Sequence, residues 1–307
     1  MGQSCCSGGL GNLGYQSEAL AGPTIGGFLQ QRTANDGTTN GFSSALTSIT
    51  SVALNALINH PDPSKRIYPV KVLRDFITTQ GDPQTQSFAD GQSGITGKGI
   101  KSVTAFITGQ GGAYIEKLQT HGCEDMNFYP IDVCGGFEIQ LDRGNSLLTG
   151  IPIFADSWKT DRVAAVANAT VAGINIAFEY DVLLTVDALH RYIGNSFIES
   201  NLKTIMGLLD VIAVISDQTA TGFKATLTTA FGSVLSAIKV VGWVTADFVL
   251  NNKTTPGAIV ITSATETEAG VSGVYDFVIP TTTVTDTLEL TDDMDGFELI
   301  KQFTLTP

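Results

Sequence analysis

The side chains best suited to catalysis or metal binding are few in this chain of 307 residues, which has three histidines and four cysteines. Cys5 and Cys6 are adjacent and cannot readily pair with each other. His121 and Cys123 lie close together, with Cys134 eleven residues later, and no pair has the CxxC spacing typical of zinc sites. Three histidines among many serines give only chance combinations for a Ser–His–Asp triad. We therefore expect no catalytic residue, no metal site, and cysteines that remain free thiols in a reducing compartment.

Two glycine-rich stretches match phosphate-binding loops only in part. Gly94–Gly99 reads GITGKG and Gly8–Gly14 reads GGLGNLG. Neither follows a predicted strand and opens a predicted helix inside a β-α-β unit, which is the geometry that holds a phosphate. GITGKG also lacks the Ser or Thr that follows Gly-Lys in a P-loop. We therefore expect no nucleotide and no other cofactor.

An acidic segment near the C-terminal end has the carboxylate density of a calcium loop. It contains Asp292, Asp293 and Asp295. It lacks the twelve-residue length of an EF-hand, and Glu298 comes too early to close one. A solvated turn between two strands is the simpler interpretation, and the sequence leaves ion binding by Asp292–Asp295 open.

The stretch Gln86–Val103, QSFADGQSGITGKGIKSV, predicts two extended arms joined by a tip rich in Gly, Ser and Lys. The tip glycines permit backbone angles that are closed to other residues. Lys101–Thr108 is β-branched and aromatic, which predicts a strand. Long hairpins with flexible tips often reach a neighbouring subunit. We expect an inter-subunit contact made by Gln86, Phe88, Gly94, Ile95, Gly97, Lys98, Gly99 and Lys101.

Strands dominate the elements predicted around this hairpin. Apolar residues near helical spacing predict helices over Ser43–Asn59 and Ala113–Thr120. Residues 186–192 and 198–208 are predicted to be helical or loop linkers. Strands are predicted over Thr24–Gln31, Arg66–Thr79, Met126–Val133, Gly136–Leu141 and within Ala172–Thr185.

The last hundred residues have a different composition, with 12 acidic and 4 basic residues between Leu208 and Pro307. Short predicted strands follow one another at regular spacing, which is typical of an immunoglobulin-like sandwich. Trp243 and Phe248 are candidates for its core, and Val274–Pro280 alternates cleanly. The strands are predicted over Asp210–Ser216, Gly222–Thr228, Ser236–Val241, Phe248–Asn251, Ala258–Thr265, Gly273–Ile279, Thr287–Leu290 and Phe297–Leu305.

Composition supports a mainly β fold in three parts: an N-terminal arm and helix over 1–64, a β domain with the long hairpin over 65–207, and the sandwich over 208–307. Hydrophobic residues make up 43% of the chain and charged residues 15%, so a large core is expected. The net charge of −13 argues against a protein that binds nucleic acid through phosphate contacts. No signal peptide and no membrane-spanning run is visible, so we expect no membrane insertion.

The order of these elements resembles that of the tail tube proteins of tailed bacteriophages. The resemblance rests on the strand and hairpin over Arg66–Thr108, the helix Ala113–Thr120, and the strands from Met126 to Thr185. It implies a β-sandwich or barrel with one flanking helix. The segments IKVVGWVTADFVLNN, AIVITSATE, GVYDFVIP and DTLELT resemble the Ig-like modules of phage and bacterial surface proteins.

The tail tube resemblance implies a structural virion protein that assembles in the host cytoplasm and is not an enzyme. Its subunits would form hexameric rings that stack into a tube, with the hairpin and the terminal arm reaching the next ring. Other tail proteins would be partners, and DNA would pass through the lumen without sticking to an acidic protein. The Ig-like module would project outward as a decoration domain.

Two other classes of protein remain open on the sequence. One is another virion structural protein, such as a capsid decoration or minor capsid subunit. The other is a cell-surface adhesin, which would normally need a signal peptide.

Overall fold

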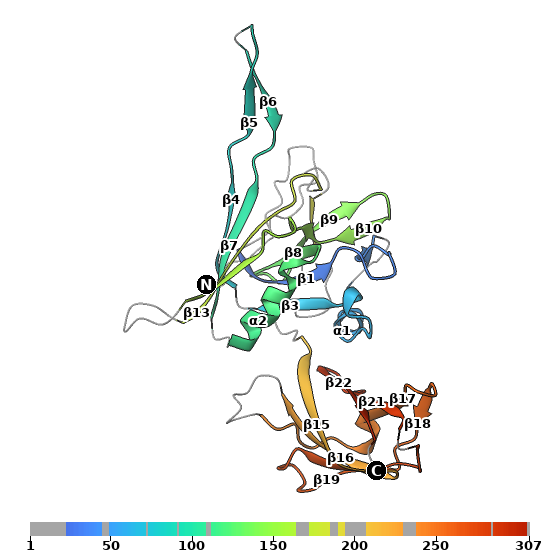
Figure 1. Cartoon of the computed structure of the whole chain (residues 1–307). Helices are drawn as coiled ribbons and strands as arrows, with labels where there is room; N and C mark the ends of the chain where they lie inside the picture. The colour runs from blue at the N-terminus through green and yellow to red at the C-terminus, as the bar shows by residue number, and fades with distance from the viewer. Residues whose placement is uncertain are drawn as a thin grey trace. The chain divides into compact units, whose positions relative to one another are not determined.

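The computed structural model describes residues 23–44, 49–71, 73–90, 92–108, 112–163, 172–184, 190–193, 207–229, 238–283 and 285–305. The chain divides into two compact units, Met1–Gly207 and Leu208–Pro307. Both units are built mainly from β-strands, and helices are few (Figure 1). The prediction of a mainly β protein is therefore confirmed.

The first sheet of the first unit includes a strand from the N-terminal part of the chain. The strand predicted over Thr24–Gln31 is present as β1, which pairs antiparallel with β3 on one side and β8 on the other. The strand order is β2-β10-β9-β8-β1-β3, with β11 paired to β8 and β14 to β9. The bounds are β2 Phe42–Ser43, β3 Ile67–Lys71, β8 Met126–Asp132, β9 Phe137–Asp142, β10 Leu147–Thr149, β11 Ile151–Pro152 and β14 His190–Ile193.

The second sheet has four strands in the order β12-β13-β7-β4. Their bounds are Lys159–Val163 for β12, Gly173–Glu179 for β13, Lys101–Thr108 for β7 and Leu73–Gln80 for β4. Alternate residues of β7 and β13 are buried, as the two-residue period of a half-buried strand requires.

One hydrophobic cluster joins the two sheets. Leu29 and Phe128 of the first sheet belong to the same buried cluster as Ile107 and Ile176 of the second. Helix α2, Gly112–Thr120, adds Leu118 to that cluster. The two sheets therefore pack face to face, with the predicted short helix beside them.

Further aromatic residues pack around β8 and β9. Phe42 meets Tyr129 edge-on at 5.9 Å, and the Tyr129 hydroxyl donates a 2.8 Å hydrogen bond to Oε1 of the buried Gln30.

Helix α1 spans Ser51–Ile58. Thr50 caps its N-terminus, and the Thr50 side chain accepts a hydrogen bond from the Ala53 N–H. The helix is shorter than predicted, because residues before Thr50 are extended or turn where the structure describes them.

The second unit contains one curled sheet of eight strands in the order β18-β17-β21-β22-β15-β16-β20-β19. The sheet folds around one core, in which Trp243 and Phe248 lie 5.4 Å apart and Tyr275 and Phe277 are buried. The bounds are β15 Leu209–Thr219, β16 Gly222–Thr229, β17 Phe248–Asn252, β18 Gly257–Ile259, β19 Ser263–Glu266, β20 Val274–Val278, β21 Thr287–Asp292 and β22 Phe297–Thr304.

A carboxylate fastens two loops of this unit. Glu266 accepts hydrogen bonds from the backbone N–H groups of Gly242, Gly270 and Gly273, at 3.1, 2.7 and 2.9 Å. Burial pushes the pKa of Glu266 upward, but these hydrogen bonds outweigh it and hold the pKa below its ordinary value. The ionised side chain is therefore the form that the folded loops favour.

Further predicted elements differ in the structure. The linker predicted over residues 186–192 ends in a strand, because His190–Ile193 form β14 and pair with Phe137–Gln140 of β9. The strand predicted over Arg66–Thr79 is divided between β3 and β4. The strand predicted over Ala258–Thr265 is divided between β18 and β19. Within Ser236–Val241 only Ile238–Val241 is described, and Lys239 makes a single bridge to Thr228. The predictions for residues 1–22 and 198–206 lie outside the described residues.

No helix in the described part of the chain is both long enough and apolar enough to span a membrane.

Candidate interaction site

The long hairpin of the first unit runs from Leu73 to Thr108 and extends away from the two sheets (Figure 1). Its base is β4 paired with β7, in a register that places Leu73 opposite Ile107 and Gln80 opposite Lys101. Beyond the base, β5 (Gln84–Ser87) pairs with β6 (Ser93–Gly97). The hairpin is therefore longer than the predicted Gln86–Val103 and uses all of β4 as its first arm.

A bulge marks the point where the first arm leaves the core. The register shifts between Arg74 and Ile77, and Asp75 has a φ of 49°. Bulges increase the local twist and redirect a strand. Only Leu73 of β4 is buried, while the opposite strand β7 keeps alternate residues in the core. β7 therefore anchors the hairpin.

The distal half has no core of its own. All residues from Gly81 to Asp90 are exposed, and Phe88 is 51% exposed. No buried hydrophobic residue of the described chain lies between Leu73 and Val103. A two-stranded ribbon is marginally stable by itself in water. A partner that covers the ribbon would supply the burial that it lacks.

The tip glycines serve close approach and not unusual backbone angles, which corrects the prediction for Gly94, Gly97 and Gly99. None of the three has a positive φ. A Cβ on Gly99 would lie 1.8 Å from the carbonyl oxygen of Gly81, and one on Gly94 would lie 2.7 Å from the Phe88 ring. A side chain does not fit at Gly99, because the two arms touch there, or at Gly94, because the Phe88 ring lies against it.

The structure brings most of the eight predicted contact residues together. Gln86 pairs with Gly94, Ile95 with Thr85, and Gly97 with Gln84. Lys98 and Gly99 lie in the connection to β7, whereas Lys101 lies at the base, opposite Gln80. The prediction missed Ile77 and Ile100, which are 55% and 47% exposed. The β-branched pattern indicated their strands but not which face would be open.

Both ends of the second sheet are open edges in the described part of the chain. β4 pairs there only with β7, and β12 pairs only with β13. Open edges present unpaired backbone N–H and C=O groups, and they readily pair with another chain. The hairpin and the two edges are therefore candidate surfaces for self-association.

The basic residues in and near the hairpin lie in different surroundings. Arg66 is buried, and its Nε donates to the backbone carbonyl of His60. Arg74 is exposed on β4, and Lys101 lines a cavity at the base of the hairpin. The side chain of Lys71 lies outside the described set.

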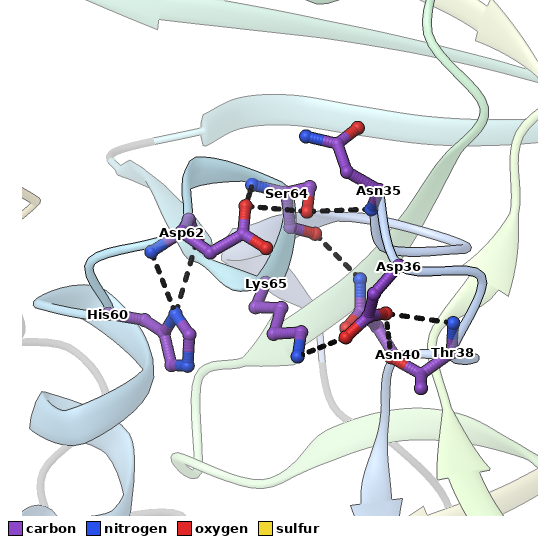
Figure 2. A network of polar contacts seen from close by, with 8 residues as sticks. All are labelled: Asn35, Asp36, Thr38, Asn40, His60, Asp62, Ser64 and Lys65. Carbon is purple, nitrogen blue, oxygen red and sulfur yellow. Dashed lines mark hydrogen bonds and ion pairs between the residues drawn. The ribbon is translucent and has the colours of Figure 1, made fainter.

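A polar network around His60, Asp62 and Ser64 contains the residue types of a hydrolase triad but not its connections (Figure 2). The Asp62 carboxylate accepts from both the N–H and the hydroxyl of Ser64, at 2.9 and 2.7 Å. The ring of His60 instead accepts from the Asp62 N–H at 3.0 Å. No ring nitrogen meets the Ser64 hydroxyl, so the network acts as a brace between loops.

The same network ties this loop to the segment after β1. The Ser64 hydroxyl accepts from the Asn35 N–H at 2.9 Å, and Lys65 pairs with Asp36 at 2.6 Å (Figure 2). Thr38 donates to Asp36 through both its N–H and its hydroxyl. Hydrogen bonds from Lys65 and Thr38 hold the pKa of Asp36 well below its usual range. These contacts fix the end of β1 beside η1, Pro63–Lys65.

The other candidate sites from the sequence stay separate. His121 contacts Glu124 at 2.9 Å, while Cys123 is exposed and Cys134 lies in another turn. No group of three His, Cys, Asp or Glu side chains lies close enough to hold a metal within the described ranges. In the acidic segment, Asp292 accepts a hydrogen bond from the Leu299 N–H.

No protein-family model and no curated protein matches this chain.

Proposed function

We propose that this chain is the self-assembling tail tube subunit of a tailed bacteriophage, a structural virion protein whose hexameric rings stack around a DNA-conducting lumen. The observation that carries the proposal is the Leu73–Thr108 hairpin: its residues from Gly81 to Asp90 are exposed, and no hydrophobic residue described between Leu73 and Val103 is buried. Contact with another subunit would bury these exposed residues and stabilise the hairpin.

The reach of the hairpin supports contact between successive rings. From Thr78 to Phe88 the chain spans ten residues, or about 33 Å at ~3.3 Å per residue. A projecting arm that docks on a different surface of the next copy makes a heterologous contact, which repeats without closing. Stacking by this hairpin therefore yields a filament.

The open edges of the second sheet support ring closure. If β4 of one subunit approaches β12 of the next, each ring satisfies the backbone groups of both edges. The net charge of −13 supports a lumen that repels the phosphates of passing DNA. Virion location and assembly with other tail proteins follow from this assignment.

The second unit is proposed to be an Ig-like decoration domain. Support comes from its strands, which surround one aromatic core of Trp243, Phe248 and Tyr275 and pair antiparallel except for β15 with β22. Its separate compactness fits a module appended to the assembling unit.

Sedimentation velocity over a range of protein concentrations tests the proposal. We expect the purified chain to form species of at least six subunits whose fraction rises with concentration. A chain that stays monomeric at high concentration would contradict it, and closed shells would favour a capsid protein. The variant Val260→Thr is a control for surface substitution and should assemble like the wild type, because Val260 is exposed in a loop of the second unit.

A further inference from the structure

The long hairpin is interrupted at the same level on both of its strands (Figure 1). Residues 81–83 separate β4 from β5, and residues 98–100 separate β6 from β7. The distal pair β5–β6 forms a two-stranded sheet of its own, apart from the four-stranded sheet that contains β4 and β7. The hairpin therefore consists of a base and a distal ribbon joined by two short connections.

Each of these two parts is held together by its own contacts. In the base, β7 pairs with β4 and β13 and buries Val103 and Ile107 in the core of the first unit. In the ribbon, the Phe88 N–H donates to the Gln92 carbonyl at 2.7 Å, and the Phe88 ring lies against Gly94 of the opposite strand. The base and the ribbon can therefore each stay intact when the angle between them changes.

The two connections meet backbone to backbone at Gly81 and Gly99. A Cβ on Gly99 would lie 1.8 Å from the Gly81 carbonyl oxygen, so no side chain fits between the chains at this point. The Gly81 N–H donates to the Ile100 carbonyl at 2.8 Å. Ile100 is 47% exposed, and Asp82 and Pro83 are exposed as well. Burial therefore does little to fix the angle between the ribbon and the base.

Glycine lets both chains bend at this level, because it can adopt backbone angles that other residues avoid. Neither Gly81 nor Gly99 has a positive φ in the conformation described, so this wider range is free for a movement. Pro83 fixes its own φ and restricts the residue before it, which concentrates the bending of the first connection at Gly81. The second chain can bend at Gly99, directly opposite, so the two chains share one axis.

We propose that Gly81 and Gly99 form a hinge about which the distal ribbon swings as a unit relative to the base. Hinges generally consist of a few residues at the ends of elements that absorb changes in φ and ψ. Ser87 lies six residues beyond Gly81, about 20 Å at ~3.3 Å per residue, so a swing of ~20° moves it by ~7 Å. In the proposed tube, on which this consequence rests, the hinge lets successive rings tilt while the ribbon stays docked.

Double electron–electron resonance measures the swing in the full chain, with the native cysteines replaced by serine. The chain is kept below the concentration at which sedimentation detects assembly. Spin labels at Ser87→Cys and Glu116→Cys, both exposed sites, report the ribbon against the base. Labels at Thr104→Cys and Glu116→Cys, also exposed, give the reference width within the first unit. We expect the first distance distribution to be broader than the reference by several ångströms.

A matched pair of glycine variants locates the hinge. Gly81→Ala should narrow the distribution, because a Cβ there has room at 3.5 Å from the Ile100 carbonyl oxygen but restricts the backbone. Gly257→Ala in the second unit should leave the width unchanged, and its Cβ also has room, at 3.9 Å from the Thr255 carbonyl oxygen. A thermal melt of each variant verifies that the fold is retained.

Labels at Ser87→Cys and Ser93→Cys, which lie opposite each other in β5 and β6, separate swinging from fraying. We expect strong dipolar broadening in the continuous-wave spectrum, and its loss would overturn a ribbon that moves as a unit. A wild-type distribution as narrow as the reference, or one that Gly81→Ala leaves unchanged, would overturn the hinge. These results do not depend on whether the chain forms tubes. Where tubes form, those of Gly81→Ala should bend less in electron micrographs than those of Gly257→Ala, and equal bending would refute the role in ring tilt.

Discussion

Removing the distal part of the hairpin should abolish stacking between rings and leave the fold almost unchanged. The variant deletes residues 82–99 and joins Gly81 to Ile100 through Asn-Gly. The Gly81 N–H already donates to the Ile100 carbonyl at 2.8 Å, so the two arms are paired where the new turn begins. Asn-Gly favours the two-residue turn that fits the twist of a hairpin.

The expected change in stability follows from burial. Among the residues of the deleted segment whose burial the structure describes, no hydrophobic side chain is buried, and the exposed Phe88 lies over Gly94, which is deleted with it. Changes outside the core usually alter the free energy of unfolding by within about 0.5 kcal/mol. In a unit of this size, a change of 1 kcal/mol in the free energy of unfolding shifts Tm by ~2–4 °C, so the expected Tm shift is about 1–2 °C.

Differential scanning calorimetry and negative-stain electron microscopy measure the two effects. We expect an almost unchanged Tm together with single rings or free subunits in place of stacked rings. A fall in Tm of more than ~6 °C would mean that the ribbon supports the core, contrary to the burial pattern. Stacks as long as those of the wild type would show that the distal ribbon is not the stacking contact.

Three smaller changes test other parts of the account. Tyr129→Phe leaves the buried Gln30 without its donor and should lower the free energy of unfolding by about 1–3 kcal/mol, measured by denaturant melts. The pKa of Glu266 in the folded chain lies below its value in the unfolded chain, which is ~4.3. The stability that Glu266 adds to the folded chain is therefore fully present above pH ~4.3 and is lost as the pH falls through the folded pKa. Glu266→Gln should therefore lower Tm at neutral pH and reduce the loss of Tm on acidification; equal acid sensitivity would contradict the loop clamp. Gly99→Ala should separate the arms at Gly81 and impair stacking with little change in Tm, whereas wild-type stacking would show that the close approach is dispensable.

Local pattern was enough to predict strands whose residues alternate or are strongly β-branched. Lys101–Thr108 has the predicted bounds, and the apolar side of Val274–Val278 is the buried side. Period-two patterns encode such strands directly. β14 was missed because its four residues gain their structure from pairing with β9, which no local pattern reports.

The candidate site was predictable only in its outline. Glycine and serine content indicated a tip, but the bulge at Asp75 and the use of β4 as an arm depend on where the core ends. The role of Gly99 depends on a contact with Gly81 across the hairpin.

Electron microscopy of the purified wild-type chain, with class averages of end-on and side views, shows directly whether the chain forms stacked rings. We expect rings of six subunits around an open lumen, stacked with an axial repeat that the ~33 Å reach of the hairpin can bridge. Monomers at high concentration, closed shells, or stacks in which the hairpin points into solvent would contradict it.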